Sequence, residues 1–295
     1  MSAIHQLIAL FVALIWGTNF VFIRYGLNEL PAFTFATLRF ALVAFPLVFF
    51  LPKPKASWRM IIAYGLAIGF GQFGLIFWAM QSNVSPGLAS LIVQMQVFFT
   101  IFISALLFKE IVTFYQWLSL AICFLGLFTI IVFTDGQTTI LGIFLVLLAA
   151  LSWAMGNIVV KQVGQVNILA FIVWSSLFSA PALFAMAMIF EGPNLAFHAI
   201  QSANWKIWLV VAWQIVGNTL IGYALWNMLL RNYPAAMVTP WALLVPVFGI
   251  GSSWLLLSEP LPWWKLLACG LIFIGLIGNI ASSNSKKPPK LSTAL

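Results

Sequence analysis

The chain has 295 residues, of which 63% are hydrophobic and only 6% are charged, whereas a soluble domain carries about 25% charged residues. So few charges cannot cover a water-exposed surface, which excludes an ordinary soluble domain and predicts that lipid covers most of the exterior. The net charge of +8 comes from basic residues placed singly at the ends of apolar runs. This pattern is typical of membrane topology and predicts no nucleic-acid partner.

Ten apolar runs follow one another along the chain, each about long enough to cross roughly 30 Å of hydrocarbon as a helix. Short polar segments with proline, glycine or a charge separate them. The sequence therefore predicts an all-α polytopic membrane protein with ten transmembrane helices. We expect these helices near residues 4–26, 32–51, 58–80, 86–108, 114–133, 139–161, 168–190, 205–230, 235–257 and 263–281.

The distribution of lysine and arginine predicts the orientation of these helices. With both termini in the cytoplasm, nine of the 13 basic residues fall in inner loops or the tail and three at outer ends, while Arg39 lies inside the second helix. Because basic residues concentrate on the cytoplasmic side, this count favours N-in and C-in. Residues 282–295 are predicted to form a disordered cytoplasmic tail.

The two halves of the chain resemble each other. Residues 16–24 (WGTNFVFIR) correspond to residues 153–161 (WAMGNIVVK), and residues 96–110 correspond to residues 245–259, both of which end in glutamate. Five helices per half is an odd number, so the second copy must be inverted in the membrane. The sequence thus predicts two inverted five-helix repeats, at residues 1–137 and 138–281, with a substrate site near the midplane at their interface.

Seven short strings spread over nearly the whole chain carry a resemblance to a known family. They are WGTNF (16–20), LRF (38–40), GQFG (71–74), PGLASLIVQMQVFFT (86–100), SWAMGNI (152–158), GYALW (222–226) and LLVPVFG (243–249). With them the chain resembles the EamA family of the drug/metabolite transporter superfamily. The resemblance implies a place in the bacterial inner membrane and export of cysteine, O-acetylserine or similar neutral amino acids. Related exporters move drugs or other metabolites, so a multidrug or other small-metabolite exporter is the alternative.

Polar and aromatic side chains inside the predicted helices are candidates for a substrate site, since polar groups in a bilayer usually face a cavity or another helix. Two residue sets share one helix face each: Trp16 with Asn19, and Trp153 with Asn157 and Lys161. They would form an aromatic, amide-lined pocket for a small zwitterion, and hydrogen bonding between helices is the competing interpretation. The predicted substrate-binding residues are Trp16, Asn19, Gln72, Gln94, Trp153, Asn157, Asn218 and Tyr223.

Two glutamines of the fourth predicted helix, Gln94 and Gln96, lie about 200° apart around a regular helix. They cannot both face one narrow cavity. We expect Gln94 to face the cavity and Gln96 to join neighbouring helices.

Three cations are candidates for gating or structural ion sites. Arg24 and Lys161 end the first and sixth predicted helices at opposite membrane faces, where snorkelling to the headgroups and a gating role are alternatives. Arg39 lies deeper and must find carbonyls, water or an acid there.

Acids and histidines are confined to loops and helix ends, at Glu29, Glu110, Asp135, Glu191, Glu259, His5 and His198. A deep carboxylate proton relay is therefore unsupported, while facilitated diffusion and peripheral proton coupling both stay open. The sequence has no cluster for intramembrane catalysis or a metal and no nucleotide-binding motif, so we expect neither an enzyme nor a cofactor. It predicts a secondary transporter that works by alternating access, with a channel-like facilitator as a further alternative.

Overall fold

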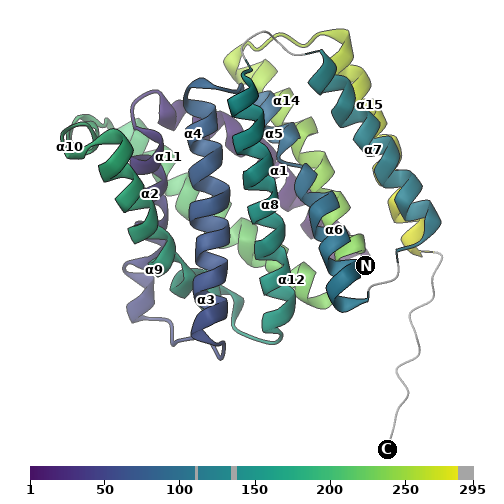
Figure 1. Cartoon of the computed structure of the whole chain (residues 1–295), viewed down its shortest axis with the longest axis horizontal. Helices are drawn as coiled ribbons and strands as arrows, with labels where there is room; N and C mark the ends of the chain where they lie inside the picture. Colours follow the sequence, from purple (N-terminus) through teal and green to yellow (C-terminus); the bar gives the residue numbers. More distant parts are fainter. Residues whose placement is uncertain (110–111, 134–137, 285–295) are drawn as a thin grey trace, which may run out of the picture.

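The structure is a computed structural model that describes residues 1–109, 112–133 and 138–284. These residues form only helices and connecting loops, and the helices stand side by side in one bundle (Figure 1). Eight helical segments are long and apolar enough to cross a membrane. They are Ala3–Leu27, Ala32–Phe49, Trp58–Ser82, Pro86–Phe108, Ile140–Val163, Ile168–Glu191, Trp205–Asn232 and Ala235–Leu257.

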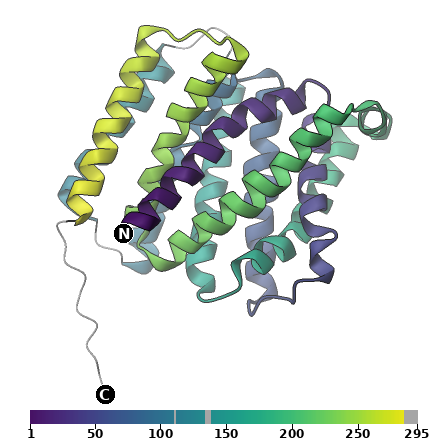
Figure 2. The ribbon, with the colours of Figure 1, turned by 180° about the vertical axis from the view of Figure 1, so that it is seen from behind.

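The two other predicted spans correspond to helices α7 (Phe114–Val132) and α15 (Trp263–Asn284). They pack along each other at one edge of the bundle, as Figures 1 and 2 show. Within the part of the chain that the structure describes, their apolar stretches are Phe114–Gly126 and Trp263–Gly275. The prediction of an all-α polytopic membrane protein is confirmed, whereas the count of ten spans stays a prediction.

Several spans consist of more than one labelled element, because the backbone hydrogen-bond pattern changes within them. Among the eight segments, the unbroken helices are α1 (Ala3–Leu27) and α8 (Ile140–Val163). The composite spans contain α2 (Ala32–Ala44), η1 (Leu47–Phe49), α3 (Trp58–Gly65), η2 (Leu66–Gly74), α4 (Leu75–Ser82), α5 (Pro86–Ile92), α6 (Met95–Phe108), α9 (Ile168–Met186), η3 (Ala187–Glu191), α11 (Trp205–Trp213), η4 (Gln214–Tyr223), α12 (Ala224–Asn232), α13 (Ala235–Val238), η5 (Thr239–Leu244) and α14 (Val245–Leu257). A short helix, α10 (Pro193–Ser202), lies at the other edge of the bundle (Figure 1).

The irregular stretches recur at matching places in the two halves. The π-helical segment η2 lies inside the third span, and the π-helical segment η4 lies inside the span from Trp205 to Asn232. Helices α6 and α14 both end at a residue in the left-handed region, Lys109 with φ 53° and Ser258 with φ 55°. These two residues are 258 − 109 = 149 positions apart, which is the offset that aligns residues 96–110 with residues 245–259.

Most long helices begin after a Ser, Thr or Asn whose side chain accepts a hydrogen bond from a first-turn N–H, but α2 begins after Pro31 without such a cap. Glu191, at the end of η3, provides the missing acceptor. Its carboxylate accepts from Phe33 N at 2.6 Å, Thr34 N at 2.9 Å and Thr34 Oγ1 at 2.6 Å. A side chain from the second half thus satisfies the first turn of α2.

We expect Glu191→Gln to lower the free energy of unfolding by about 1–2 kcal/mol, because the amide replaces one acceptor oxygen with a donor that faces N–H groups. Thermal unfolding of the purified protein in detergent measures this loss. The matched control is Glu29→Gln, since the Glu29 carboxylate accepts only an exposed bond from Asn204 Nδ2. We expect its effect to stay within about 0.5 kcal/mol; equal losses in the two variants would contradict the capping role of Glu191.

Candidate substrate site

A small closed cavity lies inside the bundle, where elements of the two halves meet. It holds about 20 Å³ of free space, room for about one water molecule. Its walls come from α1, η2, α4, α8, η4, α14 and the turn after α5. Six of the predicted substrate-binding residues line it together: Trp16, Asn19, Gln72, Trp153, Asn218 and Tyr223.

Three aromatic side chains surround the Trp16 ring beside this cavity, and we call the four rings together the aromatic cage. The ring centre of Trp16 lies 5.1 Å from Trp153, 4.8 Å from Tyr223 and 5.1 Å from Trp226. Gly222 makes this packing possible, since a Cβ there would lie 2.5 Å from Trp16 Nε1. Trp226 is a member of the cage that was not among the predicted residues.

An amide network joins α1 to η4 beside the cage. Gln214 Nε2 donates to Asn19 Oδ1 at 2.7 Å, and Asn218 Nδ2 donates to Gln214 Oε1 at 3.1 Å. On the other wall, the Tyr223 hydroxyl donates to Gln72 Oε1 at 2.8 Å. Gln214 was not among the predicted substrate-binding residues, although its spacing of four residues places it on the same helix face as Asn218.

The predicted residue Asn157 lies outside the cavity lining and is fully engaged with its neighbours. Its Nδ2 donates to Gln96 Oε1 at 3.1 Å and to Thr100 Oγ1 at 3.0 Å, while its Oδ1 accepts from Trp226 Nε1 at 3.2 Å. Asn157 therefore positions Trp226 and joins α8 to α6. It lies one turn along α8 from Trp153, which does line the cavity.

The two glutamines of the fourth span have different surroundings. Gln96 accepts the hydrogen bond from Asn157 and so joins two helices. Gln94 is buried in the turn between α5 and α6, where its Nε2 donates to Ser90 O at 2.9 Å and its Oε1 has no protein partner. The cavity is lined by the neighbouring Val93 and not by Gln94.

Arg24 and Lys161 have equivalent contacts at opposite ends of the bundle. Arg24, near the end of α1, donates to Met80 O at 3.4 Å, and Lys161, near the end of α8, donates to Tyr233 O at 3.1 Å. Each cation thus reaches a carbonyl near the end of the third span in its own half. Neither residue lines the closed cavity.

Arg39 is fully buried in α2 and contacts the amide network through Gln214. Its Nη1 donates to Gln214 Oε1 at 3.0 Å and its Nε donates to Thr219 Oγ1 at 2.8 Å. The guanidinium carbon lies 3.6 Å from the centre of the Phe73 ring. Because Phe73 lines the cavity, one aromatic ring separates the Arg39 charge from the free space.

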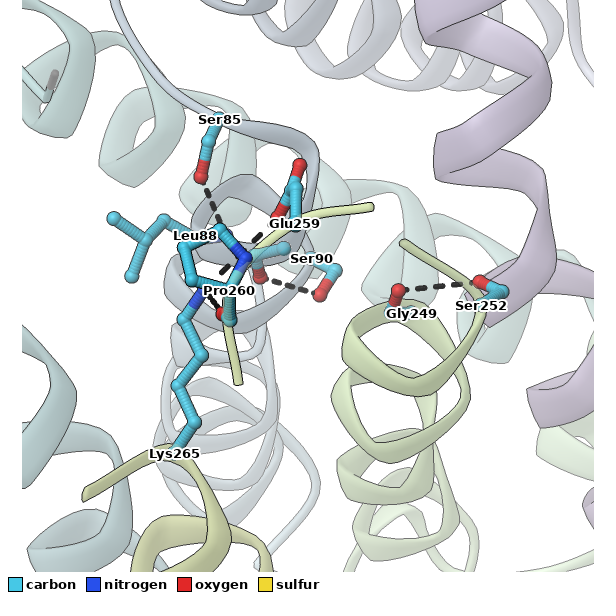
Figure 3. A network of polar contacts seen from close by, with 9 residues as sticks. Ser85, Leu88, Ser90, Gly249, Ser252, Glu259, Pro260 and Lys265 are labelled. Carbon is cyan, nitrogen blue, oxygen red and sulfur yellow. Dashed lines mark hydrogen bonds and ion pairs between the residues drawn. The ribbon is translucent and has the colours of Figure 1, made fainter. Parts of the chain in front are cut away.

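A larger depression of about 500 Å³ opens at the end of the bundle where Arg24 lies. Figure 3 shows part of its polar wall, where Lys265 Nζ donates to Pro260 O at 3.1 Å and lies 4.0 Å from Glu259 Oε2. The cavity-lining residue Ile23 is adjacent in sequence to Arg24, which lines the depression. Glu110, which the predicted repeat aligns with Glu259, lies outside the described residues, as do Asp135 and the predicted tail from residue 285 onward.

The residues that the structure describes contain no evident metal site. In the ranges that the structure describes, no group of three or more His, Cys, Asp or Glu side chains could hold a metal ion. The cavity lining consists of aromatic, aliphatic and amide side chains. Such a site can bind and release a small molecule.

Comparisons with known proteins agree with this arrangement. The sequence profile of the EamA-like transporter family matches the chain twice, at residues 4–132 and 140–281. Proteins of Escherichia coli K12 and Salmonella typhimurium, both named "probable amino-acid metabolite efflux pump", are 36% and 35% identical to it, over 99% of this chain and 100% of theirs. A protein of E. coli K12 named "uncharacterized inner membrane transporter YedA" is 27% identical, over 92% of this chain and 91% of its own length.

A solved crystal structure shares the fold, with a TM-score of 0.73 over 97% of this chain and 99% of the other at 17% sequence identity. The matches of profile and relatives confirm the predicted family resemblance and indicate a transporter rather than an enzyme. The chain belongs to the EamA-like transporter family.

Proposed function

We propose that the protein exports small amino-acid metabolites, such as cysteine, O-acetylserine or similar neutral amino acids, across the bacterial inner membrane by alternating access. The observation that carries this proposal is the closed cavity between the two halves, lined by Trp16, Trp153 and Tyr223 of the aromatic cage and by the amides of Asn19, Gln72 and Asn218. Aromatic faces attract an ammonium group, and amides can both donate and accept hydrogen bonds. A small zwitterion offers both kinds of partner.

The relatives support the substrate class and the location. Two full-length relatives carry a name that refers to efflux of amino-acid metabolites, and a third carries a name that refers to the inner membrane. The cavity in its present form holds about 20 Å³, which is too small for an amino acid. It therefore represents a closed form, and substrate entry needs the helices to separate.

The proposed pathway depends on two inverted repeats, at residues 1–137 and 138–281. The family profile matches each half once. Helix α1 packs against α14 and η4, and helix α8 packs against α6 and η2. Under the repeat alignment these are equivalent pairs, so α1 and α8 occupy matching places.

Helix directions also support the inversion. Pro86 at the start of α5 and Leu257 at the end of α14 both line the large depression. The fourth span therefore begins at the membrane face where its repeat counterpart ends, so the two run in opposite directions. With the N-terminus and C-terminus in the cytoplasm, as the positive-inside pattern favours, the depression opens to the outside and would form the exit.

The purified transporter, reconstituted in liposomes loaded with labelled O-acetylserine or cysteine, is expected to release these substrates faster than protein-free liposomes and with saturation. The aromatic cage could also attract a lipophilic cation, so tetraphenylphosphonium is the matched probe for a multidrug exporter. We expect it neither to be released nor to compete. Release of no amino acid above leak would refute the proposed function, and release of tetraphenylphosphonium alone would favour the multidrug alternative.

A further inference from the structure

Arg39 holds a positive charge inside the bundle with neutral partners only. Its side chain is 0% exposed, its Nε and Nη1 donate to Thr219 and Gln214, and its Nη2 has no protein partner. In the part of the chain that the structure describes, the hydrogen bonds and ring contacts of Arg39 include no carboxylate. The guanidinium is thus stabilised by one hydroxyl, one amide oxygen and the face of Phe73.

This arrangement is costly if Arg39 serves packing alone. Arginine keeps its proton in proteins, and a buried charge without an opposite partner costs several kcal/mol. A leucine or methionine would fill the same space without that cost. An anionic group bound beside Arg39 would offset the cost, and a guanidinium matches the two oxygens of a carboxylate.

The contacts of Arg39 place its charge next to the closed cavity. Gln214 Oε1 accepts hydrogen bonds from both Arg39 and the cavity-lining Asn218. A second buried donor without a protein partner, Trp153 Nε1, belongs to the cavity lining. Two unsatisfied donors, one of them charged, favour a ligand that accepts hydrogen bonds and carries negative charge.

Phe73 lies between the guanidinium and the free space. It belongs to the π-helical segment η2, Leu66–Gly74. Short π-helical stretches are frequent at functional sites. A shift of this segment would move the Phe73 ring away from the guanidinium and open the guanidinium to the cavity.

We infer that Arg39 is the carboxylate-binding residue of this transporter, reached when Phe73 moves aside. The aromatic cage then receives the ammonium end of the substrate. This inference rests on the proposed export of amino-acid metabolites and narrows it: substrates need a free carboxylate, and an amine that lacks one is repelled by the buried cation.

The test is counterflow of labelled L-cysteine into proteoliposomes, under reducing conditions, with two matched competitors. 3-Mercaptopropionate keeps the carboxylate and lacks the amine, whereas cysteamine keeps the amine and lacks the carboxylate. Because a charge-assisted hydrogen bond contributes about 1.5–3 kcal/mol, 3-mercaptopropionate should inhibit at a concentration at least about tenfold lower. Equal inhibition, or stronger inhibition by cysteamine, would overturn the inference while leaving amino-acid transport in place.

The variant Arg39→Gln should abolish this preference, and Arg39→Lys should restore part of it. The control is Arg59→Gln, which changes an exposed arginine at the start of α3 and should keep the wild-type preference. A folded Arg39→Gln protein with an unchanged preference would contradict the inference. If that variant does not fold, the ratio of the two inhibitory concentrations in the wild type decides alone. If cysteine is not transported, the rise in melting temperature with each competitor gives the same comparison.

Discussion

Alanine in place of Trp16 is expected to lower amino-acid counterflow at least tenfold and to destabilise the protein by about 3 kcal/mol or more. The Trp16 ring is 5% exposed and contacts Trp153, Tyr223 and Trp226, so its removal leaves the centre of the aromatic cage empty. The loss of its face also removes the largest surface available to a substrate ammonium. Counterflow in proteoliposomes and thermal unfolding in detergent measure the two effects.

Two further variants separate these effects from a general loss of tryptophan. Trp16→Phe keeps an aromatic face and loses the Nε1 bond to Asn218 O, which is long at 3.4 Å, so it should retain most of the stability. Trp254→Ala removes a ring that is 53% exposed on the outside of α14 and should leave counterflow unchanged. Trp16→Ala with wild-type counterflow would show that the aromatic cage is not the binding site.

Gly17→Ala is expected to lower the free energy of unfolding by about 1–3 kcal/mol, although it adds a single methyl group. A Cβ at Gly17 would lie 2.4 Å from Phe248 Cβ and 2.6 Å from Val245 O on α14. Two of the three atoms nearest to this Cβ are backbone atoms of α14, so the substitution forces α1 and α14 apart. Because α1 carries Trp16 and Asn19 on either side of this crossing, counterflow should fall as well.

The control for this variant lies on the facing helix. Gly251→Ala places a Cβ in open space, with no atom within 4 Å, and replaces glycine by a better helix former. We expect its melting temperature to equal or exceed that of the wild type. A Gly17→Ala protein as stable as Gly251→Ala would contradict the close crossing of α1 and α14.

Local signals predicted the positions of the helices well. The runs predicted at 86–108 and 235–257 appear as Pro86–Phe108 and Ala235–Leu257. Both are bounded by a proline or a charge, and apolar length is a property of the chain itself.

The side-chain network was harder to predict, because the spacing of residues gives their directions only in a regular helix. In η4 the backbone is π-helical, so its side chains point in directions that 100° per residue does not give. Gln214, in this segment, was missed as the residue that joins Asn19 to Arg39. The fourth span is also irregular, because a turn at Gln94 separates α5 from α6.

The position of a residue along the helix axis was the second feature that the sequence did not predict. Trp153 and Asn157 share a face of α8, as predicted, but four residues correspond to about 6 Å of rise. The cavity is only about 20 Å³, so a single turn decides whether a residue lines it. Asn157 instead holds Trp226 in place, a role that depends on packing between α8 and α12 and has no local signal in the sequence.

We propose that the transporter is a carrier whose single substrate site alternates between the two membrane faces. Trans-stimulation tests this mechanism most directly, by comparing uptake of labelled cysteine into proteoliposomes that contain unlabelled cysteine with uptake into empty ones. We expect internal cysteine to accelerate uptake severalfold, Trp16→Ala to abolish the acceleration and Trp254→Ala to preserve it. Uptake that neither saturates nor responds to internal cysteine would exclude alternating access and indicate a channel.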